Sequence, residues 1–165
     1  MNLNFKDLKI VSEFEVYQSE NELSLPEKNL LQQAKKGLNN AYAPYSKFLV
    51  CAAVLLENNE IIIGNNQENA AYPSGLCAER VAIFYASSKF PNVAIKAIAV
   101  VCKANNKDIN EVVSPCGACR QAIAEYETRD NKEIRIIMPG ENSSVYVAKS
   151  IQNLLPLMFN GKCLK

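Results

Sequence analysis

The stretch FLVCAAVLL, from Phe48 to Leu56, determines the fold class of this chain. It is too short and too continuously apolar for a surface helix, so we expect a strand. Asn58 and Asn59 follow it and favour a turn into a second strand over Ile61 to Ile63. The stretch therefore predicts a hairpin in the core.

Working outward, helical and apolar segments alternate along the chain. Apolar residues recur at helical spacing from Leu25 to Ala43, which predicts an amphipathic helix that ends at Pro44. The other expected elements are helices at Cys77 to Lys89 and Gly117 to Thr128, strands at Ala94 to Cys102, Ile134 to Met138 and Ser144 to Ala148, a short helix at Ile151 to Leu155, and an edge strand within residues 9 to 17. This alternation is typical of a layered α/β domain.

Length and composition restrict the classes of protein to consider. A chain of 165 residues without repeats or long linkers is expected to form a single domain over 1–165, in which we assign no function to residues 1–24. Lys and Arg total 18 against 17 Asp and Glu, so no strong positive field favours nucleic acid or anionic lipid as a partner.

The chain shows no signal for export or membrane insertion. Its amino terminus lacks a basic segment followed by an apolar core, and no apolar stretch reaches the length of a membrane span. We therefore expect a cytoplasmic protein without a membrane partner. In a reducing compartment, its six cysteines are expected to be free thiols or metal ligands.

Three cysteines and one glutamate carry the expected chemistry. Cys77 and Glu79 lie in CAER, and Cys116 and Cys119 lie in SPCGACRQ. The chain contains no histidine, which excludes histidine triads and zinc sites built on two histidines. On the first turn of a helix, residues three apart lie on one face, so the pair in SPCGACRQ can bind one ion. Three thiols leave one position for water, which is typical of a catalytic zinc site.

The residues around these ligands have expected roles as well. Pro115 suits the first position of a helix, with Ser114 as its cap. Arg80 and Arg120 each follow a candidate site residue, and we expect them to donate hydrogen bonds to the thiolates and reduce the negative charge of the site. Burial near these thiolates is expected to raise the pKa of Glu79 and suit it to proton transfer.

These motifs resemble those of the cytidine deaminases, specifically the small type that has three cysteine ligands and forms homotetramers. The resemblance runs from about Ala43 to Phe159 and rests on APYSKF, GNNQENAAYPSGLCAER and SPCGACRQ. It implies a three-layer α/β/α fold with a mixed sheet of about five strands, and one zinc ion per chain. The implied reaction is hydrolytic deamination of cytidine and 2′-deoxycytidine to uridine and 2′-deoxyuridine, with release of ammonia, in pyrimidine salvage.

The resemblance also implies individual roles. Glu79 would pass a proton from the attacking water to the cytosine ring, the Ala78 amide would hold the pyrimidine carbonyl, and the Ser114 carbonyl would meet the amino group. The remaining implied contacts are those of Phe48 with the base, of Asn66 and Glu68 with the ribose 3′-hydroxyl, and of Tyr72 and Phe159 with the pocket of a neighbouring subunit.

Two segments depart from the family pattern. Residues 45–53 read YSKFLVCAA where the family usually reads YSKFPVGAA, and residues 154–159 read LLPLMF where it commonly reads LLPGAF. A deaminase of another aminopyrimidine, a structural zinc module and a thiol redox protein remain as alternatives. Asn66 and Glu68 favour a free nucleoside, because a polynucleotide would occupy the 3′-hydroxyl.

Overall fold

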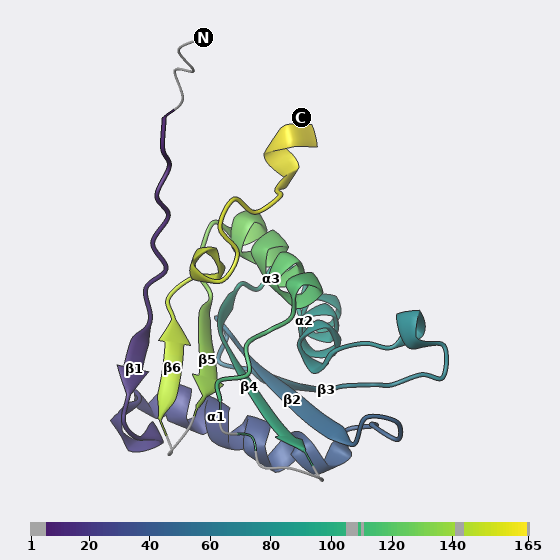
Figure 1. Cartoon of the computed structure of the whole chain (residues 1–165). Coiled ribbons are helices and arrows are strands. Elements are labelled where there is room, and N and C mark those ends of the chain that lie inside the picture. Colours follow the sequence, from purple (N-terminus) through teal and green to yellow (C-terminus); the bar gives the residue numbers. More distant parts are fainter. Residues whose placement is uncertain (1–5, 105–108, 110, 141–143, 165) are drawn as a thin grey trace.

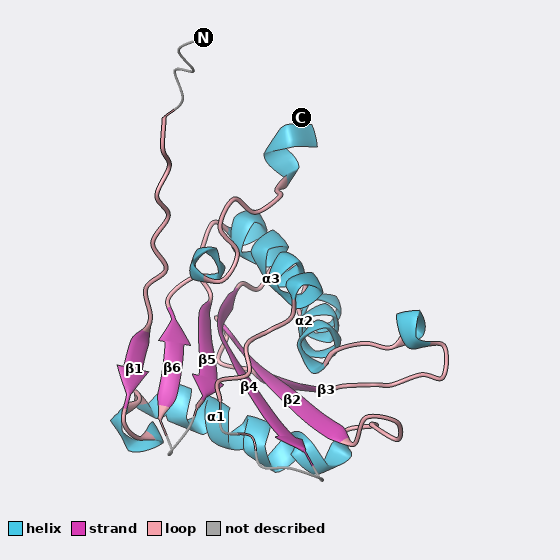
Figure 2. Ribbon diagram, in the orientation of Figure 1, coloured by secondary structure: helices cyan, strands magenta, loops and turns pink. Residues whose placement is uncertain are grey.

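The computed structural model describes residues 6–104, 109, 111–140 and 144–164, without the side chains of residues 162 and 163 (Figures 1 and 2). Within them, six strands form one mixed sheet, in which β4 and β5 are parallel and all other neighbours are antiparallel. In spatial order they are β1 (Glu15–Tyr17), β6 (Val145–Ala148), β5 (Arg135–Pro139), β4 (Ile95–Ala104), β2 (Phe48–Leu56) and β3 (Ile61–Asn65).

Helices cover both faces of this sheet. Helix α1 (Leu25–Gly37) packs on one face, and α2 (Ala78–Lys89) and α3 (Gly117–Asp130) pack on the other (Figure 1). Strand β2 is buried on both sides, because alternate residues face opposite helical layers. The expectation of a three-layer α/β/α fold is confirmed.

The amino-terminal extension contributes the sixth strand. Within the segment expected to hold an edge strand, only Glu15–Tyr17 pairs, in antiparallel register with β6. Arg135 on β5 holds this strand in place, because its guanidinium lies 2.8 Å from Glu15 and 2.6 Å from Glu27 on α1. The sheet therefore has one strand more than the five expected.

Two helix boundaries differ from expectation. Helix α1 ends at Gly37 and is followed by a 3-10 turn over Leu38–Asn40, although the apolar spacing continues to Ala43. The chain leaves the helix because Tyr42 hydrogen-bonds with the main chain of residues 66 and 68. Near the carboxyl end, the expected short helix is a 3-10 turn over Ile151–Asn153. Among the described helices, none has the length and apolar character required to cross a bilayer.

Helix α2 lies directly on β3 at Gly64. A Cβ atom at this glycine would lie 2.4 Å from the nitrogen of Ala82 and 2.6 Å from the carbonyl oxygen of Ala78. Both are main-chain atoms of α2, so no side-chain rotation can make room for a methyl group. The absence of a side chain at Gly64 therefore sets the distance between the sheet and the helix that follows Cys77.

We predict that Gly64→Ala destabilises the protein by about 3 kcal/mol, equivalent to roughly 6–12 °C in Tm for a chain of this size. Thermal unfolding monitored by circular dichroism measures this change. Gly161→Ala is the matched control, because a Cβ atom at that glycine would meet no atom within 4 Å. An equal Tm for the two variants would contradict the proposed close packing.

Candidate metal centre and substrate pocket

Two candidate ligands cap the helices of one face. Cys77 is the N-cap of α2 and Cys116 is the N-cap of α3, both in extended backbone conformation. The expected cap at Ser114, with Pro115 as the first helical residue, is therefore wrong by two positions. The N-cap and the third helical residue lie on the same side of the first turn, which brings Cys119 next to Cys116.

The three sulfur atoms have the geometry of a zinc site. The Sγ atoms of Cys77, Cys116 and Cys119 all lie within 4.8 Å of one another, and those of Cys77 and Cys116 are 3.8 Å apart. Sulfurs bound to one tetrahedral zinc at about 2.3 Å would also lie about 3.8 Å apart. Cys119 is buried and Cys116 is exposed, so the cluster opens on the Cys116 side. The donor set therefore fits zinc.

The environment favours negative charge on one of these sulfurs, that of Cys77. Hydrogen bonds from the Cys119 thiol and from Arg80 lower the pKa of Cys77 to about 5, against the opposing effect of burial. The pKa of Cys119 is raised, first because it donates to the Cys77 thiolate and then because it is buried. A divalent cation would replace the shared proton and stabilise all three thiolates.

The Arg80 guanidinium lies beside the Cys77 sulfur. Its Nη2 lies 3.8 Å from the Cys77 sulfur, as expected from the sequence, and the hydrogen bond to this thiolate raises the pKa of Arg80. Its Nε atom is buried and has no hydrogen-bond partner among the described residues. The guanidinium therefore faces the sulfur cluster and not a surface carboxylate.

Glu79 lies in the first turn of α2 and is only 5% exposed. Burial raises its pKa, and the negative charge of the neighbouring Cys77 raises it further. A carboxyl group with a raised pKa can both accept and donate a proton near neutral pH. Glu79 and the exposed side of the sulfur cluster line the same cavity.

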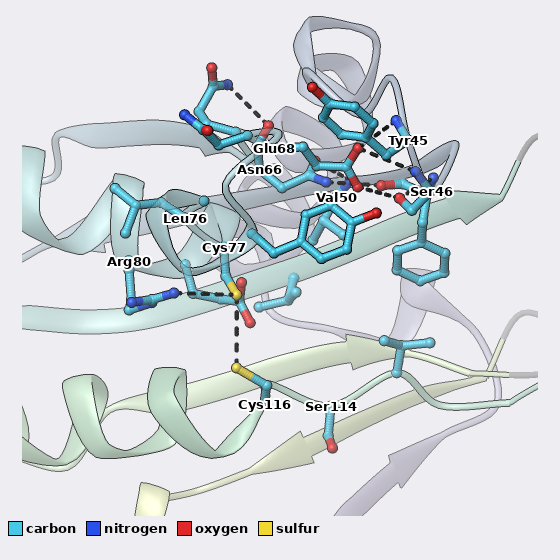
Figure 3. A pocket seen from close by; sticks show the side chains of 18 residues that line it. Tyr45, Ser46, Val50, Asn66, Glu68, Leu76, Cys77, Arg80, Ser114 and Cys116 are labelled. Atoms are coloured by element: carbon cyan, nitrogen blue, oxygen red, sulfur yellow. Dashed lines mark hydrogen bonds between the residues drawn. The ribbon is translucent and has the colours of Figure 1, made fainter.

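The cavity has a volume of about 740 Å³ and extends from the sulfur cluster to the β2–β3 edge of the sheet. Figure 3 shows Cys77, Arg80 and Cys116 at one end, and Tyr45, Ser46 and Glu68 at the other. The predicted residues that line it are Phe48, Asn66, Glu68, Tyr72, Cys77, Glu79, Arg80, Ser114 and Cys116. Sequence reasoning did not select Tyr45 and Ser46, although the APYSKF motif contains both.

Asn66 and Glu68 form hydrogen bonds with main-chain atoms of other residues that line this cavity. The Asn66 side chain accepts from Val50 N at 2.9 Å and donates to Phe48 O at 2.9 Å, so it continues the ladder beyond β3. Glu68 accepts hydrogen bonds from the amides of Tyr45 and Ser46 and from the Ser46 hydroxyl. The hydroxyl contact is the main cause that lowers the pKa of Glu68.

Four predicted residues lie outside the cavity lining, and one of them is the buried ligand candidate Cys119. Ala78 is buried in the first turn of α2, where the amides have no partner within the helix. Phe159 is 60% exposed on the carboxyl-terminal segment. Arg120 donates to oxygen atoms of Pro115, Ser114 and Leu154, so the expectation that it donates to the thiolates is wrong.

Residues 26–132 match the family model described as the cytidine and deoxycytidylate deaminase zinc-binding region, and this match includes the three clustered cysteines. The chain belongs to the cytidine deaminase family. It is 42% identical over 135 residues to a cytidine deaminase of Sporosarcina psychrophila, which covers 82% of this chain and 92% of that relative.

Solved structures of the family have the same fold. A cytidine deaminase from Burkholderia pseudomallei superposes with a TM-score of 0.68 at 34% identity, over 79% of this chain and 97% of that chain. A cytidine deaminase from Mycobacterium tuberculosis has a TM-score of 0.65 at 28% identity, over 82% of this chain and 98% of that chain.

We predict that Cys77→Ala lowers the zinc content of the purified protein by at least about tenfold after dialysis, because the substitution removes one of three ligands. Elemental analysis by mass spectrometry measures the zinc. Cys102→Ala is the control, since this thiol lies outside the cluster and burial raises its pKa to about 11. Equal zinc in the two variants would exclude the proposed ligand set.

Proposed function

We propose that this chain is a zinc-dependent cytidine deaminase that converts cytidine and 2′-deoxycytidine to uridine and 2′-deoxyuridine, with release of ammonia, in pyrimidine salvage. The observation that carries the proposal is the single cavity shared by the sulfur cluster and the buried carboxyl group of Glu79. Family membership supports the same reaction.

In this proposal Glu79 moves the protons. Zinc, when bound, lowers the pKa of water toward neutrality and so supplies the nucleophile for hydrolysis. Glu79 would accept one proton from the attacking water and deliver it to N3 of the cytosine ring, while the water oxygen bonds to C4. Glu79 would then transfer the second proton of that water to the amine, so that the C4–N bond breaks and ammonia leaves. Its raised pKa supports both steps, because the group must be ionised first and protonated afterwards.

The other walls of the cavity would bind the nucleoside. We propose that the Ser114 carbonyl accepts from the amino group and that the Ala78 amide donates to the pyrimidine carbonyl. Phe48 would pack on the base. These roles are supported by the position of Ser114 and Phe48 in the cavity lining and by the place of Ala78 in the first turn of α2.

A free nucleoside is the proposed substrate class. Asn66 and Glu68 would bind the ribose 3′-hydroxyl, which a phosphodiester linkage would block in a polynucleotide. The lowered pKa of Glu68 keeps its carboxylate ionised and able to accept a hydrogen bond from this hydroxyl. The net charge of +1 gives little attraction for a polyanion, which supports the same choice.

We further propose a cytoplasmic homotetramer with one zinc ion per chain, folded as a single domain. Exposed aromatic side chains support an assembly, because exposed apolar patches mark protein interfaces. Tyr72 is 75% exposed and Phe159 is 60% exposed, and both would complete the pocket of a neighbouring subunit. A reducing compartment would keep the three ligand thiols available to zinc.

We predict that the purified zinc protein eliminates the ultraviolet absorbance band of cytidine over time and releases ammonia. Glu79→Gln should retain zinc and lose turnover by about 10²-fold or more, because the amide cannot transfer the proton. Absorbance kinetics and elemental analysis of the same samples measure both quantities.

Glu125→Gln is the control for this variant, because Glu125 is exposed on α3. Unchanged turnover in Glu79→Gln would reject the proposed mechanism. Faster deamination of a cytosine-containing oligonucleotide than of cytidine would instead reject the nucleoside as substrate.

We also propose that Arg80 restores the ability of an all-thiolate site to activate water, since its guanidinium reduces the negative charge on Cys77. Arg80→Ala is expected to keep zinc bound and to lower turnover by roughly 10-fold to 100-fold. Lys89→Ala, an exposed cation on the same helix, is the control. Full turnover in Arg80→Ala would show that the thiolates need no such neutralisation.

A further inference from the structure

Helix α3 holds the carboxyl-terminal segment of the chain along most of its length. Near the end of the helix, Glu127 accepts from the Ser150 hydroxyl at 2.6 Å and from Ile151 N at 3.1 Å. Near its start, Arg120 donates to Leu154 O at 2.8 Å and Gln121 donates to Phe159 O at 2.9 Å. The segment therefore lies beside α3, as Figure 1 shows, and three of the four contacts use its main chain.

The same arginine also contacts the turn that precedes the helix. Its Nε donates to Pro115 O at 2.7 Å and its Nη2 donates to the Ser114 hydroxyl at 2.8 Å. A guanidinium is planar and presents its donors in a fixed arrangement, so these bonds and the bond to Leu154 O set one relative position for two segments. One side chain thus connects the cavity wall at Ser114 with the carboxyl-terminal segment.

The segment contains a strained residue between its two contacts with the start of α3. Leu157 has a φ of 54°, in the left-handed region, and its side chain is 83% exposed. A residue other than glycine costs about 1–2 kcal/mol in this region. Such strain persists where the surrounding structure over-determines the conformation, and the bonds to Leu154 O and Phe159 O provide this constraint on both sides.

We propose that Arg120 is a positioning residue that fixes the Ser114–Pro115 turn at the substrate cavity by joining it to the carboxyl-terminal segment. This inference rests on the proposed function, since the turn matters to a substrate that contacts Ser114. Arg120 is thereby distinguished from Arg80, whose guanidinium faces sulfur. Loss of Arg120 weakens substrate binding and leaves the metal in place.

The test compares Arg120→Met and Arg120→Lys with Arg129→Met, a control on the same helix whose guanidinium contacts Asp130 and Ser87. Both Arg120 variants are expected to raise the KM for cytidine by about tenfold or more. The value of kcat should change less than KM, and zinc content should be unchanged. Because lysine retains the charge but not the planar group, it should not restore KM.

A second measurement does not depend on activity. Limited proteolysis with chymotrypsin, followed by mass spectrometry, measures the rate of cleavage after Phe159. Both Arg120 variants are expected to be cleaved faster than the unsubstituted protein, and Arg129→Met is not. An unsubstituted protein that is inactive on cytidine would refute the proposed function. The cleavage rates would still test whether Arg120 joins the Ser114–Pro115 turn to the carboxyl-terminal segment.

The connection between Arg120 and Ser114 also predicts non-additivity. Ser114→Ala should raise KM when made alone, but it should add nothing in the Arg120→Met background, because the shared hydrogen bond is already absent. Three outcomes would overturn the proposal. They are a KM restored by Arg120→Lys, a loss of zinc in Arg120→Met, and an unchanged KM and cleavage rate in both Arg120 variants.

Discussion

The contact between Gly64 and the main chain of α2 is the constraint on which the metal centre depends. A strand and a helix normally lie apart by the thickness of their side chains, but here main-chain atoms of α2 come within 2.4 Å of the position of a Cβ atom. Cys77 immediately precedes α2, so the distance between this helix and the sheet sets the position of the Cys77 sulfur. The other two candidate ligands are Cys116, the N-cap of α3, and Cys119 in its first turn. One ion can contact all three sulfurs only when both helices lie at matching distances from the sheet.

Arg80 and Arg120 both lie near a candidate metal site that contains no histidine, but they contact different groups. Thiolate ligands give a zinc site more negative charge than neutral imidazoles do, and the Arg80 guanidinium donates a hydrogen bond to the Cys77 sulfur. Arg120 donates instead to oxygen atoms of two chain segments. The two residues look equivalent in the sequence, since each follows a site residue directly. Their different surroundings separate the electrostatic role that we propose for Arg80 from the geometric role that we propose for Arg120.

The sequence predicts local features of this protein well and long-range contacts poorly. The main helices and strands follow from periodicity, and the proximity of Cys116 and Cys119 follows from their spacing of three residues. Cys77 lies 39 residues before Cys116, and its place in the cluster was expected from the motif that contains it. The partners of Arg120 do not follow from local spacing, because Leu154 lies 34 residues further along the chain. The bonds of Glu68 to the turn at Tyr45 and Ser46 likewise join segments more than 20 residues apart. The end of α1 was missed for the same reason, since a contact of Tyr42 with residues 66 and 68 competes with the helical pattern.

The contacts of α3 with the carboxyl-terminal segment use mainly main-chain groups: two carbonyl oxygens, which every residue type has, and one amide N–H, which every residue type except proline has. Arg120 and Gln121 would meet the same oxygens whichever side chains followed Leu155, provided that the main chain keeps its path. The exposed residues Pro156 and Leu157 can therefore vary during evolution without loss of these bonds, whereas Met158 packs against the core. For this part of the chain, sequence identity is a poor measure of whether two proteins share the same structure.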